Sequence, residues 1–221
     1  MASGIPKDEI ERNHMKPTTI LLVFLALFMV SCNSKTVGSP DEDTIGYVAT
    51  DNVDSILTTP WMAVYMDYLK MDSLPCGLES YRRWGLAYVD DDEVPEMVFM
   101  GNCEACGKVM LTQYNGRVGQ WNSWRNGVDF APKRGLIRNN DGSMGHYYDR
   151  YIRLERGTFV EYLTHEEYVE GNTRSFTIFN NDTVGAEVAV QEERRFESLP
   201  HLDIDSIPSF PIDILLMYLK K

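Results

Sequence analysis

The stretch VDDDEVPE, residues 89–96, gathers the carboxyl groups of this chain that are best placed to do chemistry. Asp90, Asp92 and Glu96 alternate as the oxygen donors of calcium loops do, and a bound cation would relieve repulsion between adjacent carboxylates. A calcium loop also needs a residue that turns sharply, usually glycine, but acids fill the intervening positions. We therefore favour a solvated acidic turn, whose Asp side chains accept hydrogen bonds from backbone amides, over a calcium site.

The strand after this turn sets the direction of each side chain. A period of two points Met97 and Phe99 to the core, together with Val94, and turns Glu96 to the opposite face. We expect Glu96 to face solvent, or a cation held with Asp90 and Asp92. Catalysis by paired carboxylates is not expected. It needs two carboxyls in different environments, whereas all the acids of a single exposed turn share much the same environment.

Cysteine and histidine are the next candidates for chemistry. Cys76, Cys103 and Cys106 are expected to form a disulfide, either within the C-x-x-C pair or from Cys76 to one of its members. Reduced thiols and a zinc site completed by His146 are the alternatives, and redox catalysis ranks last. The other histidines of the predicted mature chain, His165 and His201, fall in no nucleophile or metal motif.

Aromatic residues are dense in the second half of the chain. Large aromatics dominate small β cores, so we expect most of them to be buried. If two or three lie exposed together, they would form a stacking platform for a sugar or a peptide. The residues in question are Trp121, Trp124, Tyr147, Tyr148 and Tyr151.

The N-terminal segment of the sequence predicts where in the cell the protein is located. After Met15 and Lys16, an uncharged apolar run from Ile20 to Val30 is about half as long as a membrane-spanning helix, as in a signal peptide. It ends in MVSC, which resembles the lipobox of bacterial lipoproteins and implies acylation of Cys32. We therefore predict a signal peptide over residues 1–31 with the true start at Met15, and a polar flexible tether over residues 32–46.

Charge narrows the possible partners. The chain has a formal net charge of −12, which opposes binding to nucleic acid and to anionic lipid head groups. The lipid on Cys32 would then be the contact with the membrane. Asp-Ser/Thr-apolar triplets resemble the O-glycosylation sequon of exported proteins in one Gram-negative phylum, although such triplets also begin helices. The acceptors would be Thr44, Ser55, Ser73, Thr183 and Ser206.

Residues 47–221 are long enough for one globular domain and show no internal repeat. TTPWMAVYMDYLK predicts a helix capped by Thr59 with Pro60 first, and FPIDILLMYLKK predicts another at the end of the sequence. YNGR at 114–117 is the strongest hairpin signal, and NNDG, ERGT and NNDT predict further turns. The fold class is therefore α+β, with one or two N-terminal helices, an antiparallel meander of six to eight strands and a C-terminal helix.

Three pieces of the chain in order resemble a family of secreted and lipid-anchored bacterial domains of unknown function. They are AYVDDDEVPEMVF (87–99), VMLTQYNGRV (109–118) and GSMGHYYDRYIRLERGTFVE (142–161). The first piece also resembles, more distantly, the D-x-D-G-D-G-x-x-E-L calcium loops of FG-GAP-type repeats, without their glycines. The resemblance covers residues 61–170 and implies export but no particular activity.

Together these features predict a Gram-negative lipoprotein of the outer membrane, periplasmic or surface-exposed. Its β-rich domain is expected to bind a glycan or a protein without catalysis and without a cofactor, unless calcium occupies the acidic turn. The alternative is an envelope hydrolase acting on glycan or peptide. A deep pocket with converging polar groups would favour the enzyme, and a shallow aromatic face would favour binding.

Overall fold

The computed structural model describes residues 46–48, 52–71, 74–101, 107–169 and 173–220, all within one structural unit, Glu42–Lys221. The predicted signal peptide, Cys32 and nearly all of the tether lie outside the described residues. Within the described ranges, no helix is long and apolar enough to cross a membrane.

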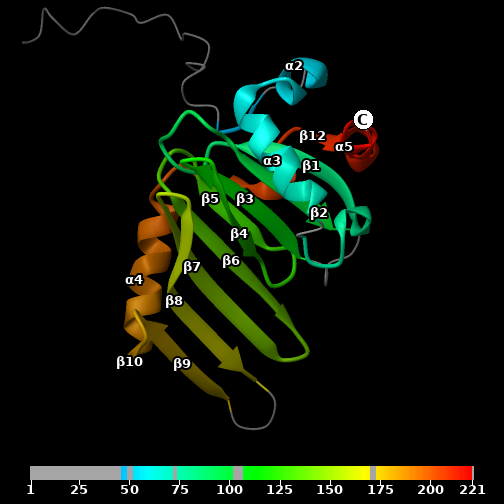
Figure 1. Ribbon diagram of the computed structural model, residues 1–221. Coiled ribbons are helices and arrows are strands. Elements are labelled where there is room, and N and C mark those ends of the chain that lie inside the picture. Colours follow the sequence, from blue (N-terminus) through cyan, green and yellow to red (C-terminus); the bar gives the residue numbers. More distant parts are fainter. Residues whose placement is uncertain (1–45, 49–51, 72–73, 102–106, 170–172, 221) are drawn as a thin grey trace, which may run out of the picture. The chain divides into compact units, whose positions relative to one another are not determined.

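The described strands form two antiparallel sheets (Figure 1). The five-stranded sheet has the order β12-β1-β2-β3-β4, with β1 (Tyr81–Ala87), β2 (Glu96–Gly101), β3 (Lys108–Tyr114), β4 (Arg117–Asn122) and β12 (Ser209–Pro211). The seven-stranded sheet has the order β10-β9-β8-β7-β6-β5-β11, with β5 (Val128–Ala131), β6 (Leu136–Ser143), β7 (His146–Glu155), β8 (Thr158–Tyr168), β9 (Arg174–Phe179), β10 (Asp182–Val184) and β11 (Leu202–Asp203). The α-helices are α2 (Val53–Leu57), α3 (Pro60–Lys70), α4 (Ala186–Glu197) and α5 (Ile212–Leu219).

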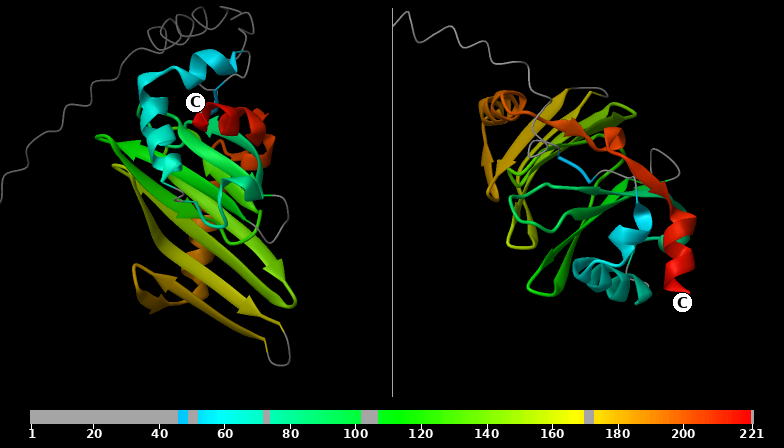
Figure 2. Two further views of the ribbon diagram at one scale, coloured as in Figure 1. Left: turned by 45° about the vertical axis from the view of Figure 1, so that its right-hand side comes forward. Right: turned by 90° about the horizontal axis from the view of Figure 1, so that it is seen from above.

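The two sheets pack against each other, and helices cover their outer faces (Figure 2). Trp84 on the outer face of the five-stranded sheet belongs to the core formed with α3 and α5. Met110 and Ile137 belong to the core between the sheets. Phe196 of α4 packs against Tyr151 on the outer face of the seven-stranded sheet. Strands of the five-stranded sheet are thus buried on both faces, which explains the unbroken apolar run MVFM in β2.

The α+β class and the antiparallel arrangement are confirmed, but the predicted meander of six to eight strands is too small. The described residues hold twelve strands in two sheets, because short strands such as β10, β11 and β12 pair at sheet edges without a strong sequence pattern. The C-terminal helix is confirmed as α5. Pro60 does begin α3, but the Thr59 hydroxyl donates to the Ile56 carbonyl instead of capping the helix.

Turn predictions succeed where the signal is local. Asn115 and Gly116 form the two-residue turn between β3 and β4, with φ of 52° and 72° as type I′ geometry requires. The turns at Arg156–Gly157 and Asn180–Asn181 also match predicted positions. NNDG is not a turn, because residues 139–142 continue β6 and the chain reverses at Met144–Gly145 instead.

Candidate functional site

The acidic turn between β1 and β2 is held by its own side chains. One Asp90 oxygen accepts the backbone N–H of Asp92 at 3.2 Å, and one Asp92 oxygen accepts that of Val94 at 2.7 Å. These bonds match the predicted turn in which Asp side chains satisfy backbone amides. Tyr65 of α3 donates its buried hydroxyl to the Pro95 carbonyl at 3.1 Å, which fixes the exit of the turn to the core.

Glu96 points to the face opposite Met97, as predicted, but the expectation that it faces solvent is wrong. Its side chain lies in the core between the sheets, 1% exposed, because the second sheet covers the face that was expected to be wet. Its carboxylate accepts the Val89 N–H at 2.9 Å and the Thr112 hydroxyl at 3.1 Å. Burial, reinforced by the charge of Asp90, raises the pKa of Glu96 to about 8. Val94, Met97 and Phe99 do pack into the core on the other face, as predicted.

No group of three or more His, Cys, Asp or Glu side chains is arranged to hold a metal ion within the described part of the chain. The oxygens proposed as calcium ligands instead bond to backbone amides or to Thr112. His146, the proposed zinc ligand, lies 2.9 Å from a Glu166 oxygen and stacks on Tyr168.

Cys76 and three of the five predicted glycosylation acceptors lie within the described residues. Cys76 is exposed and has no disulfide partner within the described residues, and because Cys103 and Cys106 lie outside them, the disulfide stays a prediction. Ser55, Thr183 and Ser206 are exposed. The two other acceptors, Thr44 and Ser73, also lie outside the described residues.

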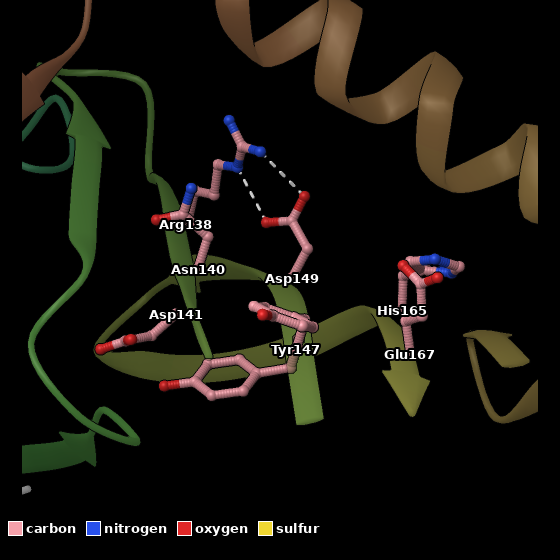
Figure 3. A pocket seen from close by; sticks show the side chains of 8 residues that line it. Arg138, Asn140, Asp141, Tyr147, Asp149, His165 and Glu167 are labelled. Atoms are coloured by element: carbon pink, nitrogen blue, oxygen red, sulfur yellow. Dashed lines mark hydrogen bonds and ion pairs between the residues drawn. The ribbon is translucent and has the colours of Figure 1, made fainter. Parts of the chain in front are cut away.

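A polar pocket of about 350 Å³ lies on the outer face of the seven-stranded sheet (Figure 3). Strand register builds it, because Asn140, Asp149, His165 and Thr177 stand opposite one another on β6, β7, β8 and β9. In an antiparallel sheet, directly opposed residues point to the same face. The pocket lining is Arg138, Asn140, Asp141, Tyr147, Tyr148, Asp149, His165 and Glu167.

Tyr147 is the aromatic wall of this pocket. Gly142 stands opposite Tyr147 on β6, and a Cβ at Gly142 would lie only 2.2 Å from the Tyr147 ring. The glycine therefore leaves room for the ring to lie across the neighbouring strand. The Tyr147 side chain remains 53% exposed. An open aromatic face beside polar groups is the arrangement that suits a ligand with both an apolar face and hydroxyl groups.

Several polar groups of the pocket have no hydrogen-bond partner among the described residues. The side chains of Asn140 and Glu167 are half-buried and make no such bond there. Thr177 contacts His165 Nδ1 at 2.8 Å, which fixes the ring and leaves Nε2 to bond elsewhere. Solvent reaches these donors and acceptors in the free protein, so they are available to hydrogen-bond a polar ligand.

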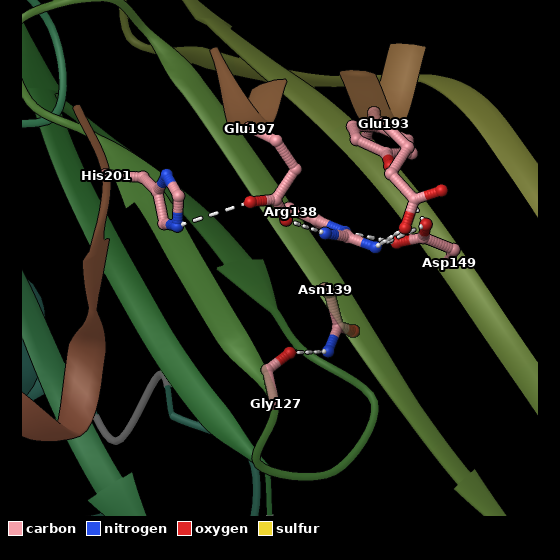
Figure 4. A network of polar contacts seen from close by, with 8 residues as sticks. Gly127, Arg138, Asn139, Asp149, Glu193, Glu197 and His201 are labelled. Carbon is pink, nitrogen blue, oxygen red and sulfur yellow. Dashed lines mark hydrogen bonds and ion pairs between the residues drawn. The ribbon is translucent and has the colours of Figure 1, made fainter. Parts of the chain in front are cut away.

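Arg138 supports one wall of the pocket (Figure 4). Its buried guanidinium binds both oxygens of Asp149, at 2.8 and 2.9 Å, and also reaches Glu193 and Glu197 of α4. Burial alone would lower the pKa of Arg138, but its hydrogen bonds with Asp149 and the negative charges around it raise that pKa above its ordinary value. Tyr151 also donates to Asp149 at 2.9 Å, so this carboxylate is held rigidly.

The opposite face of the same strands carries an aromatic row, defined as Trp124, His146, Tyr148, Tyr168 and Phe176. Its rings stack on one another, with centroids 4.5 Å apart for Trp124 and Tyr148 and 4.1 Å apart for His146 and Tyr168. The Arg150 guanidinium lies 5.2 Å from the Trp124 ring. These ring faces are used within the row, so the row mainly covers the sheet and is a weaker ligand platform than Tyr147.

The sequence placed Tyr147 in a possible stacking platform but gave no sign that it shares a pocket with His165. The missing signal was the cross-strand register, which no local pattern reveals. The aromatic expectation is partly confirmed, because Tyr148 and Tyr151 are buried while Trp124 and Tyr147 are exposed.

Comparison of the chain with protein-family models, with curated proteins and with solved structures finds no match. The chemistry of the pocket must therefore be interpreted from its own geometry.

Proposed function

We propose that this chain is a lipid-anchored protein of the Gram-negative cell envelope whose β-rich domain binds a glycan without catalysing a reaction. One observation carries the binding part. The exposed Tyr147 ring lies across Gly142 in the same pocket as Asn140 and Glu167, whose side chains have no partner among the described residues. A sugar ring offers an apolar face for the tyrosine and hydroxyl groups for the amide and the carboxylate.

The binding hypothesis predicts that Tyr147→Ala weakens glycan affinity by about tenfold or more, because the stacking surface is lost. The fold should remain intact, since Tyr147 is half exposed and belongs to none of the buried cores. The measurement is isothermal titration calorimetry with neutral oligosaccharides, namely cellotetraose, xylotetraose, mannotetraose and maltotetraose. Tyr168→Ala is the matched control, because it removes a tyrosine of similar exposure from the opposite face of the sheet. An equal loss in both variants, or no binding by wild type, would contradict the proposal.

The alternative is a hydrolase of the envelope. One observation favours it, because the carboxylates of Asp149 and Glu167 line the same pocket. Glycosidases use two such carboxylates, one as an acid and one as a base or nucleophile. Asp149, however, binds Arg138 through both oxygens and accepts a third bond from Tyr151, so it is better suited to a fixed structural role. Release of reducing sugar by wild type, abolished in Glu167→Gln, would favour the hydrolase.

The anchoring part of the proposal rests on the apolar run that ends at Cys32. We expect Cys32→Ala to block acylation and maturation, so that an alkyne analogue of palmitate no longer labels the protein. The variant should also lose its detergent-dependent partition with the outer membrane. If Cys32→Ala were still processed and recovered with membranes, the lipoprotein assignment would be wrong.

A further inference from the structure

The β3–β4 and β7–β8 hairpins meet at their tips. This contact lies at the end of β7 and β8 that is farther from the Tyr147 pocket. A Cβ at Gly119 of β4 would lie 2.2 Å from the Gly157 carbonyl oxygen, and one at Gly157 would lie 2.5 Å from the Tyr114 Cβ. Only glycine allows so close an approach of the two backbones. The β3–β4 and β7–β8 hairpins are thereby held side by side around a groove of about 710 Å³.

The charge of this groove is opposite to that of the protein. The chain carries a formal net charge of −12, yet the groove is lined by Arg117 and Arg156 and by no carboxylate. Neither guanidinium has an ion-pair partner among the described residues. Arg138, Arg150 and Arg195 pair with carboxylates, whereas Arg117 and Arg156, like other exposed arginines such as Arg174, do not do so within the described residues. Two unpaired guanidinium groups beside one groove provide donors for an oxyanion.

Arg156 also occupies an unfavourable turn position. Its φ is 50°, in the left-handed region, where Asn at position 115 of the neighbouring hairpin is the better suited residue. An arginine there costs turn stability, as Arg125 and Lys133 do at their own positive-φ positions, and asparagine would recover it.

The other residues that line the groove indicate which chemical groups the ligand carries besides its anionic group. Tyr114, 41% exposed, and Phe159 provide aromatic surface, while Asn115 and Thr158 provide an amide and a hydroxyl. The volume is that of a site for a ligand larger than a single phosphate, since pockets for small organic ligands span about 300–1,000 Å³. We infer that this groove binds the carboxylate of an acidic sugar, with Arg117 and Arg156 on the carboxylate and the aromatic wall against the ring.

The inference is separate from the proposed function, because it concerns other residues at the other end of the strands. The test is calorimetric titration of the full-length protein with trigalacturonate, with maltotriose as the neutral trisaccharide and inorganic phosphate as the simple anion. Trigalacturonate should bind with an affinity that falls as sodium chloride rises. Trp121, whose ring centroid lies 6.3 Å from that of Phe159, should report binding through its fluorescence.

The decisive variants separate charge from fold. Arg117→Gln and Arg156→Asn should each weaken trigalacturonate binding by about 10- to 100-fold, since each removes a charge-assisted hydrogen-bonding group. Arg156→Asn should at the same time raise the melting temperature by about 2 °C, because asparagine suits the turn. Arg174→Gln, an exposed β9 residue outside the groove, makes the same change of charge and should leave binding unchanged.

Three results would overturn the inference. The first is phosphate, or maltotriose tested in Tyr147→Ala, binding as tightly as trigalacturonate, and the second is Arg174→Gln weakening binding as much as the groove variants. The third is no binding of trigalacturonate by wild type. Loss of sugar-acid binding in Arg156→Asn with retained neutral-glycan binding at Tyr147 would support the groove independently of the proposed function.

Discussion

Unfolding of the wild-type protein by urea is expected to become easier as the pH rises from about 4.5 to about 8, and Glu96→Gln is expected to remove most of this dependence. The cause is the position of Glu96 in the core between the sheets. Burial raises the pKa of this carboxyl to about 8, the charge of Asp90 adds to the rise, and hydrogen bonds from Val89 and Thr112 oppose it.

The sign of the effect follows from proton binding in the two states. Below about 4.5, Glu96 is protonated in both the folded and the unfolded chain. Between about 4.5 and about 8, the unfolded chain has released this proton and the folded protein retains it, so the free energy of unfolding falls. Because a change of one in a pKa corresponds to about 1.4 kcal/mol, the full loss is roughly 3 to 5 kcal/mol.

Glutamine at position 96 can replace the neutral acid. Its amide oxygen can accept the Val89 N–H, and its NH₂ group can donate to the Thr112 hydroxyl. The variant should therefore be more stable than wild type at pH 8 and nearly as stable at pH 5. Glu93→Gln is the matched control, because it removes an exposed acid from the same turn and should keep the wild-type profile. A flat wild-type profile, or equal flattening in Glu93→Gln, would show that Glu96 is not the buried titrating group.

The acidic turn shows which structural features can be predicted from the local sequence alone. Asp90 and Asp92 were expected to accept backbone amides, and Asn115–Gly116 was expected to turn, because both depend on residues within a few positions. The burial of Glu96 was missed for a reason that no local pattern contains. A strand with one wet face and a strand between two layers differ only in what packs above them, and the covering sheet comes from residues far along the chain.

The NNDG stretch, residues 139–142, was predicted as a turn but is part of β6, because long-range contacts override its local preference. Asn and Asp favour turns because their side chains bond to nearby backbone. Asn139 instead uses its buried amide across strands, accepting the Trp124 N–H at 2.9 Å and donating to the Gly127 carbonyl at 2.7 Å. The Tyr147 pocket was equally hidden, because it depends on Asp149 standing opposite His165 and on Gly142 opposite Tyr147.

The largest loss of stability from one substitution near the pocket is expected for Arg138→Ala. Arg138 is 7% exposed and binds both oxygens of Asp149, a carboxylate whose side chain is only 19% exposed. Removing the arginine leaves this carboxylate without its cation, and breaking a buried ion pair in this way costs about 3 to 5 kcal/mol. The bonds to Glu193 and Glu197 add little, since both carboxylates are about half exposed.

Urea unfolding at pH 7 measures the loss, with Arg195→Ala as the control. Arg195 pairs with Glu192 at 2.9 Å on the same helix but is half exposed, so its removal should cost less than about 1 kcal/mol. Glu193→Gln and Glu197→Gln should each fall in that smaller range, whereas Asp149→Asn should approach Arg138→Ala because it leaves the guanidinium buried without its main partner. If Arg138→Ala cost no more than Arg195→Ala, water would have to reach Asp149 in the folded protein, and the pocket wall would not be held by this pair.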